Sequence, residues 1–132
     1  MKKCHLSIVS SVDGNENTFS YAASYKRSAF SGVLCYEENG ARVEMRFEKG
    51  AILIRREGDY GLNVVLKEGE RTEGLLFVAG ASGAVQVETT RAKYSLTETS
   101  VLASLKYRLI FQAETQEMSL RIKASCVNSE ES

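Results

Sequence analysis

The chain has 132 residues, of which 43% are hydrophobic and 26% charged, and these ordinary globular values exclude a disordered chain. The 17 Lys and Arg residues balance the 17 Asp and Glu residues, so the formal net charge is zero. A nucleic-acid-binding protein usually carries a basic excess or a basic stripe, and the linear sequence shows neither, so we expect no nucleic-acid partner.

The N-terminal residues and the cysteines indicate a reduced, cytosolic protein. Residues 4–12 contain His5 and scattered serines but no sustained apolar run, so they are unlike a signal peptide, and no segment approaches a membrane span. The three cysteines, Cys4, Cys35 and Cys126, cannot all pair, and none lies in a Cys-x-x-Cys motif. We therefore expect a cytoplasmic protein without membrane contact, whose cysteines are free thiols.

Short stretches of alternating apolar and polar residues follow one another along the chain, separated by turn signals. The alternation predicts strands at about residues 6–12, 18–25, 30–36, 43–47, 52–56, 62–66, 75–79, 85–89, 93–97, 101–112 and 118–124. The strongest hairpin signal is Asn39-Gly40, because both central residues of a type I′ turn need positive φ. Residues 125–132 carry little apolar material and are expected to form a frayed tail.

The cleanest alternation lies in residues 101–112. Leu105 and Leu109 share one parity there, and Lys106 and Arg108 share the other. Because successive side chains of a strand point to opposite faces, we expect the two leucines in the core and the two cations in solvent.

The predicted segments add up to about ten or eleven short strands without a convincing helix. The sequence contains no proline, which suits a chain of strands because proline cannot donate a hydrogen bond in a sheet ladder. Sequential hairpins favour pairing between chain neighbours, and closing such a long sheet removes its exposed edges. The sequence therefore predicts an all-β fold, in which residues 1–132 form one domain, a single closed antiparallel up-and-down barrel.

Several hairpin elements carry a family resemblance. They are the strand end at residues 52–58, the turn at 66–72, Gly83 with Val85 and Val87, and the strand at 105–107. With these elements, most of the chain resembles the YwiB-like bacterial family of unknown function. The resemblance implies a calycin, or lipocalin-like, barrel in a bacterial cytoplasm and supplies no established activity. Before Gly83 the chain departs from the pattern, since Ala79-Gly80-Ala81-Ser82 stands where we expect a Thr-Pro-like turn.

No group of residues has the arrangement of a catalytic or metal site. His5 is the only histidine, and its neighbour Cys4 points to the opposite face of a strand, so the two cannot form a dyad. Ser82 lies in a Gly-Ala-Ser-Gly turn followed by a strand, which is the setting of neither a phosphate-binding loop nor a nucleophile elbow. The carboxylates are scattered over turns and outward faces. We expect no enzyme, no catalytic residue, no metal and no cofactor.

Arg56 is the most informative polar residue. It continues the parity of Ile52 and Ile54, so the strand pattern points it toward the lumen of the barrel. A guanidinium inside a barrel must be paired, and the chain offers few inward carboxylates, so a bound ligand carboxylate or phosphate could answer that need. The alternative is that Arg56 lies at the rim beside Glu57 or Asp59.

Aromatic residues could supply the apolar walls of a lumenal site. We expect Phe47, Phe77 and Tyr107 to line it together with Arg56, although small barrels are more often simply filled by such side chains. The leading hypothesis is a non-enzymatic barrel that binds a small apolar or amphipathic ligand in its lumen. The alternative is a structural or interaction module with a filled core, which acts through a homodimer or a protein partner.

Overall fold

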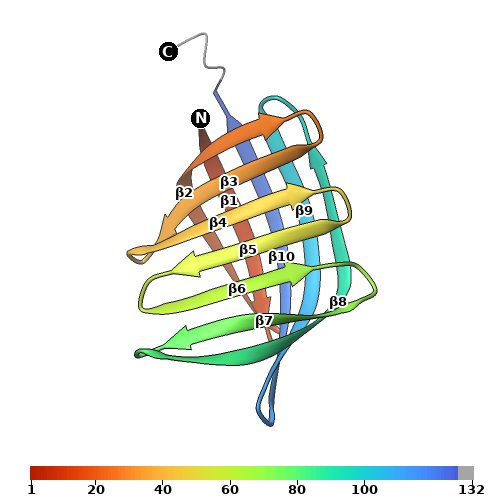
Figure 1. Ribbon diagram of the computed structural model, residues 1–132. Helices are drawn as coiled ribbons and strands as arrows, with labels where there is room; N and C mark the ends of the chain where they lie inside the picture. Colours follow the sequence, from red (N-terminus) through yellow and green to blue (C-terminus); the bar gives the residue numbers. More distant parts are fainter. Residues whose placement is uncertain (128–132) are drawn as a thin grey trace.

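A computed structural model describes residues 1–127 and contains ten strands (Figure 1). Their bounds are β1 (Lys2–Val12), β2 (Asn15–Ser28), β3 (Ser31–Glu38), β4 (Ala41–Glu48), β5 (Ala51–Glu57), β6 (Tyr60–Leu66), β7 (Arg71–Val78), β8 (Ala81–Leu96), β9 (Ser100–Phe111) and β10 (Glu114–Cys126). Residues 1–127 form no helix that is long and apolar enough to cross a membrane.

The strands form one closed antiparallel barrel in which each strand pairs with its chain neighbours. The first strand closes the barrel by pairing with the last, in a ladder that runs from Cys4 opposite Cys126 to Val12 opposite Met118. In Figure 1 the strands β3 to β7 cross steeply in front of the longer β8, β9, β10 and β1. The predicted closed up-and-down barrel is confirmed.

Several predicted details differ from the structure. Asn39 and Gly40 both have positive φ, 50° and 82°, as the predicted turn requires. No break separates residues 93–97 from the preceding strand, because β8 continues through a β-bulge between Thr89 and Arg91. The predicted tail begins too early, since Ser125 still pairs with His5 in β1. Residues 128–132 of that tail lie outside the described part of the chain.

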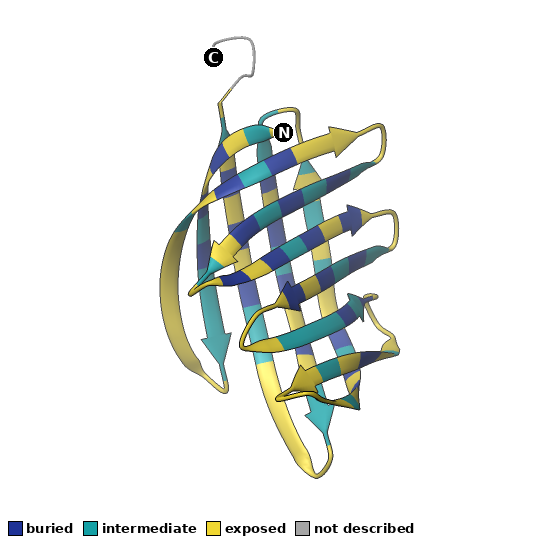
Figure 2. Ribbon diagram, turned by 60° about the vertical axis from the view of Figure 1, so that its left-hand side comes forward, coloured by how far each residue is buried: buried dark blue, intermediate teal, exposed yellow. Residues whose placement is uncertain are grey.

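The inward side chains differ in burial between the two open ends, or rims, of the barrel. The terminal rim is where β1 begins and β10 ends, and many inward side chains there are fully buried, among them Tyr25, Leu34, Phe47 and Ile52, while Tyr94 and Leu96 on β8 are partly buried. The opposite, hairpin rim carries the β1–β2, β3–β4, β5–β6, β7–β8 and β9–β10 turns. At the hairpin rim Ala41 and Arg56 are buried, but Leu62, Leu109 and Met118 are only partly buried, so part of this end of the core remains accessible to solvent (Figure 2).

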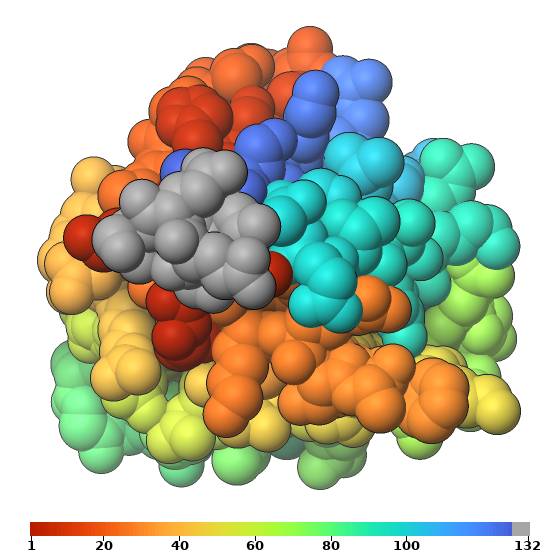
Figure 3. Space-filling model, turned by 90° about the horizontal axis from the view of Figure 1, so that it is seen from above, coloured from red at the N-terminus to blue at the C-terminus, as the bar shows by residue number. Residues whose placement is uncertain are grey.

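Contacts between two connections help to cover the terminal rim. Viewed from above, the orange β2–β3 connection lies against the cyan β8–β9 connection (Figure 3). The Tyr25 hydroxyl donates to the Thr97 carbonyl oxygen at 3.0 Å, and Arg27 pairs with Glu98 at 3.1 Å. These polar contacts join segments about seventy residues apart in the sequence across the rim.

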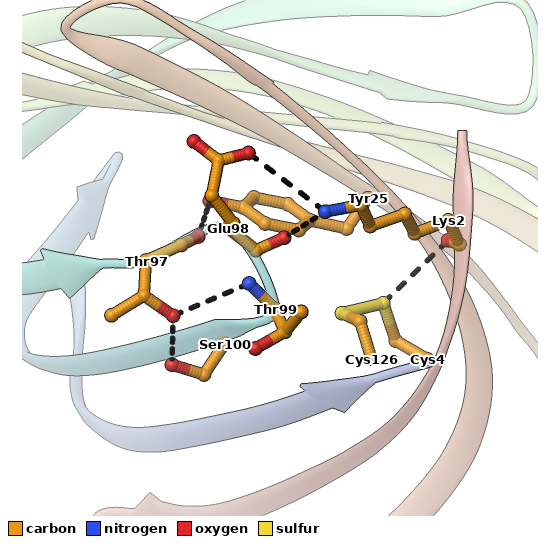
Figure 4. Close-up of a disulfide and its surroundings, with 8 residues drawn as sticks. All are labelled: Lys2, Cys4, Tyr25, Thr97, Glu98, Thr99, Ser100 and Cys126. Atoms are coloured by element: carbon orange, nitrogen blue, oxygen red, sulfur yellow. Dashed lines mark hydrogen bonds and ion pairs between the residues drawn. A yellow bond between two sulfur atoms is a disulfide. The ribbon is translucent and has the colours of Figure 1, made fainter. Parts of the chain in front are cut away.

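The prediction of three free thiols is wrong, because Cys4 and Cys126 form a disulfide. The two residues are 122 positions apart in the sequence, and only closure of the barrel places them opposite each other on β1 and β10. The bond lies at the terminal rim beside the Thr97–Ser100 connection and Tyr25 (Figure 4). Cys35 on β3 remains a half-buried thiol, and burial, followed by the charge of Glu44, raises its pKa.

The burial of β9 allows a direct test of the predicted parity. Leu105 is 1% exposed, whereas Lys106 is exposed, as the alternation predicts. Leu105→Ala is expected to lower the free energy of unfolding by about 2–5 kcal/mol, because it leaves a cavity in a packed core. Lys106→Ala is expected to change it by no more than about 0.5 kcal/mol. Urea denaturation measures both, and equal losses in the two variants would contradict the assigned face.

The disulfide should stabilise the closed barrel by restricting the unfolded chain. The double variant Cys4→Ser/Cys126→Ser is expected to lose about 2–5 kcal/mol of unfolding free energy, since the bond closes a loop of almost the whole chain. Cys35→Ser is the matched control and should leave the unfolding midpoint nearly unchanged. Alkylation of the unfolded wild type without reductant should modify Cys35 alone, and modification of all three cysteines would refute the bond.

Candidate functional site

Two polar residues are buried among the apolar side chains that fill the barrel. They are Arg56 on β5, which is 8% exposed, and Thr89 on β8, which is 4% exposed. Both lie at inward positions of the alternation, because Ile54 and Val87, two residues earlier on the same strands, are core residues. The chemistry of the lumen therefore depends on what these two side chains contact.

The Arg56 guanidinium is paired within the protein. Its Nε donates to Glu38 Oε2 at 3.3 Å, and its Nη1 lies 2.9 Å from Asp59 Oδ1 and donates to the Tyr60 carbonyl oxygen at 2.7 Å. The guanidinium carbon also lies 3.7 Å from the centre of the Tyr60 ring, in a cation–π contact. Arg56 thus ties the end of β3 to the β5–β6 turn at the hairpin rim.

The expectation that few carboxylates face inward is wrong for Glu38. This residue follows Leu34 and Tyr36 at the same parity of β3, both of which are buried, so the alternation itself could have located it. Arg56 with Glu38 and Asp59 carries one net negative charge, which leaves no unpaired guanidinium for an anionic ligand. Asp59 belongs to the rim, as the alternative interpretation of Arg56 expected.

Hydrogen bonds within this cluster shift the pKa values of Arg56 and Asp59. Burial alone would lower the pKa of Arg56, but its hydrogen bonds to Asp59 and Glu38 outweigh that effect and raise it. The hydrogen bond from Arg56 lowers the pKa of the Asp59 carboxyl. Both groups are therefore held in their charged forms, and the cluster is a permanent ionic network at neutral pH.

Aromatic side chains extend the cluster along the inner face. The Tyr21 hydroxyl donates to Glu38 Oε1 at 3.4 Å, and the Tyr21 ring lies 5.0 Å from that of Tyr36 and 6.2 Å from that of Phe19. Burial, followed by the charge of Glu38, raises the pKa of Tyr36. These phenols therefore remain neutral and act as hydrogen-bonding groups within an aromatic wall.

Thr89 and Tyr107 supply the second polar feature of the lumen. They are partners in the β8–β9 ladder, and both are buried at inward positions. The Thr89 Oγ1 atom is fully buried and has no hydrogen-bond partner within the described structure. A buried hydroxyl without a partner costs about 1–3 kcal/mol, so a native barrel is expected to satisfy it with a ligand or an ordered water.

The four residues predicted to line a site do not all come together. Tyr107 is buried on β9 opposite Thr89 and Met118, and burial, followed by the Tyr60 phenol, raises its pKa. Phe47 is fully buried near the terminal rim, where its ring lies 5.5 Å from that of Tyr94, away from Arg56. Phe77 as a lumen wall is wrong, since it is 40% exposed on the outer face.

The reason for the position of Phe77 lies in β7. Gly74 is buried and Leu76 is half-buried, so residues of their parity face the core and Phe77 faces outward. There its ring covers Gly61 on β6, since a Cβ atom at Gly61 would lie 3.2 Å from it. A hollow of about 370 Å³ beside Phe77 reaches Arg56 from the outside of the rim.

Metal ligands do not gather anywhere in the described part of the chain. Within residues 1–127, no three His, Cys, Asp or Glu side chains lie close enough together to hold one ion.

The ion pair of Arg56 can be tested by a double-mutant cycle. Arg56→Leu is expected to lower the unfolding free energy by about 1–3 kcal/mol, because it leaves the half-buried Glu38 carboxylate without its partner. Glu38→Leu in the same background should recover most of that loss. Urea denaturation of the four proteins measures the coupling, and additive effects would contradict a direct pair.

Comparison with known proteins places the chain in a family. The model of a family described as "Domain of unknown function (DUF1934)" matches residues 5–122. The crystal structure of the YwiB protein from Bacillus subtilis superposes with a TM-score of 0.81 at 18% identity, covering 96% of this chain and 93% of that one. No curated protein matches the chain. The resemblance to the YwiB-like family is confirmed, and the chain belongs to the DUF1934 family.

Proposed function

We propose that this barrel is a non-catalytic binding protein that takes up a small amphipathic ligand through its hairpin rim. The buried Thr89 hydroxyl, which has no partner, carries the proposal. It lies opposite Tyr107 in the β8–β9 ladder, so a ligand head group there meets the Thr89 hydroxyl within an otherwise apolar lining. Such a combination of apolar lining and a few convergent polar groups is typical of small-molecule sites.

The apolar body of the ligand would lie along the inner face toward the hairpin rim. Several inward side chains at this end pack against the core but stay partly exposed, among them Leu62, Leu109, Phe111 and Met118. At the terminal rim, by contrast, large side chains such as Tyr25 and Phe47 are fully buried. Entry through the hairpin rim therefore requires displacement of the fewest packed groups.

The head group is expected to be neutral. The ionic network of Arg56 carries one net negative charge, and both of its carboxylates already accept from the guanidinium. An anionic head would have to displace Glu38 or Asp59, whereas a hydroxyl or amide can pair with Thr89 at no electrostatic cost. In this proposal Arg56 holds Tyr60 and Glu38 in place and does not bind the ligand head directly.

A competition experiment tests the proposal. The neutral fluorescent probe N-phenyl-1-naphthylamine is bound to the wild type and displaced with 1-decanol or with decanoate. Decanol is expected to displace the probe at least about tenfold more effectively than decanoate, a difference of about 1.4 kcal/mol. Failure of the probe to bind, or stronger displacement by decanoate, would refute a neutral-head site.

Thr89 can be examined separately with a matched control. Thr89→Val removes the hydroxyl without changing the side-chain shape and should weaken displacement by decanol, while stability is kept or raised. Thr90→Val alters the exposed neighbour in the same strand and should have no effect. Unchanged displacement by decanol in the Thr89 variant would mean that an ordered water satisfies the hydroxyl in place of a ligand.

A protein partner or a homodimer is a second candidate function, favoured by an apolar strip on the outer face. The strip consists of Leu53, Val65, Leu75 and Phe77, from β5, β6 and β7, and a hollow of about 390 Å³ lies over its first three residues. Native mass spectrometry of the protein from its host addresses both candidates, because a co-purified small molecule favours the ligand and a dimer mass favours the strip. Leu75→Lys should abolish any such dimer.

We also propose a bacterial source, because the similar YwiB protein is from Bacillus subtilis, whereas the Cys4–Cys126 bond removes the argument that free cysteines gave for the cytoplasm. Disulfides are rare in reducing compartments. Trapping of thiols with an alkylating agent before cell lysis tests the location, since a cytoplasmic protein should be recovered mostly with Cys4 and Cys126 alkylated.

A further inference from the structure

The outer face of the long strands β8, β9 and β10 gathers positive charge. Six exposed cations point outward from these strands, because the residues between them face the core. Arg108 is paired with carboxylates, and the other five are Arg91, Lys93, Lys106, Arg121 and Lys123. We call this set the basic face. In the linear sequence the five cations come from three separate strands and form no basic run, which is why the sequence shows no stripe.

The strand register makes the basic face continuous. Arg91 lies opposite Lys106 across the β8–β9 ladder, while Lys93 and Arg121 flank Ser104 of β9 from its two sides. Lys123 follows one row further along β10. With strands about 4.8 Å apart and alternate residues about 6.8 Å apart, the Cα atoms of all five cations fall within about 17 Å.

Most of this charge is not neutralised by the protein. Lys93 pairs with Glu68 and Arg121 with Glu16, both at exposed positions on the border of the face. Within residues 1–127 the structure gives no ion pair for Arg91, Lys106 or Lys123. Exposed pairs of this kind contribute little and exchange readily, so all five cations are available to an anionic partner.

A second border limits the face toward the hairpin rim. There Arg108 lies between Glu88 and Glu117, at 3.9 Å and 2.9 Å from their carboxylate oxygens. This row of one arginine and two glutamates carries a net negative charge and would repel an anion. It therefore confines a polyanion to the rows that contain the five cations.

The face is also hollowed and rich in hydroxyl groups. Two hollows of about 850 and 670 Å³ lie along it and share Val9 and Arg121, and the larger one also extends over the bordering carboxylates Glu16, Glu88 and Glu117. Their linings include serines from four strands, namely Ser7, Ser11, Ser95, Ser104 and Ser119. Hydroxyls and cations together are the side chains that contact phosphate oxygens of nucleic acids, and they do so without reading the base sequence.

The outward positions of β8, β9, β10 and β1 carry no Phe or Tyr ring on this face. Proteins that bind single strands usually stack unpaired bases on aromatic rings, and such a platform is missing among these residues. A duplex, whose bases are stacked inside and whose phosphates lie outside, suits the face better.

We infer that the basic face binds the phosphate backbone of a nucleic-acid duplex, independently of its sequence and separately from the lumenal site. The contacts come from the five cations and the neighbouring serines. This inference departs from the expectation drawn from the linear sequence, which lacks both a basic excess and a basic run.

The test measures binding of fluorescein-labelled DNA duplexes to the full chain by fluorescence anisotropy between about 20 and 200 mM NaCl. If all five cations contact phosphates, the slope of log K against log salt should be about −4.5. Two duplexes of unrelated sequence should bind equally, and the corresponding single strand should bind more weakly. No binding at the lowest salt, a slope near zero, or tighter binding of the single strand would overturn the inference.

Variants locate the contact. Arg91→Gln, Lys106→Gln and Lys123→Gln should each weaken binding to both duplexes alike and reduce the slope by about 1. Lys49→Gln, at the exposed β4–β5 turn on another part of the surface, is the matched control and should change neither quantity. Equal losses in the control and in the three variants would overturn the assignment to this face.

A competitor distinguishes the class of partner. Poly-L-glutamate at an equal concentration of negative charge should displace the duplex poorly, because carboxylates on a flexible chain do not match a rigid array of phosphates. Displacement by poly-L-glutamate at lower charge concentrations than by unlabelled duplex would overturn the nucleic-acid assignment in favour of an acidic protein.

Discussion

The pairing of β1 with β10 is the constraint on which the rest of the structure depends. It joins the two ends of the chain in a ladder of nine residue pairs and leaves the ten-stranded sheet without a free edge. Closure also creates an inside, so that a local alternation of residue types becomes a filled core. The Cys4–Cys126 bond ties the same two strands at the terminal rim and restricts the unfolded chain almost from end to end.

The lumen combines strong packing with two polar exceptions. Toward the terminal rim, side chains such as Phe47 are packed so that they leave no accessible surface. Toward the hairpin rim, Arg56 is compensated by Glu38 and Asp59, and its burial is therefore compatible with stability. Thr89 has no such compensation. The contrast between a satisfied charge and an unsatisfied hydroxyl is what distinguishes a structural role for Arg56 from a binding role for the Thr89 region.

The outer surface of the barrel also combines two different regions, one charged and one apolar. The long strands at the back present cations and serines, whereas the short β5, β6 and β7 present an apolar strip that includes Leu75 and Phe77. A net charge of zero therefore conceals an uneven distribution of charge over the surface. Both faces consist of the outward-facing residues of the strands. Packing of the core does not constrain these residues, so they can form interactions with partners.

The sequence by itself determined what depends on neighbouring residues. Alternation placed Leu105 and Arg56 inward and Lys106 outward, and Asn39-Gly40 identified its turn, because strand parity and turn conformation are local properties. Where residues 75–79 were apolar on both faces, parity gave no answer and the orientation of Phe77 was missed. Only the tertiary structure decided which distant residues meet: Cys4 with Cys126, Arg56 with Glu38, and the cations of three strands on one face. These contacts follow from register and closure, which are set by the whole barrel and leave no signal in any one segment.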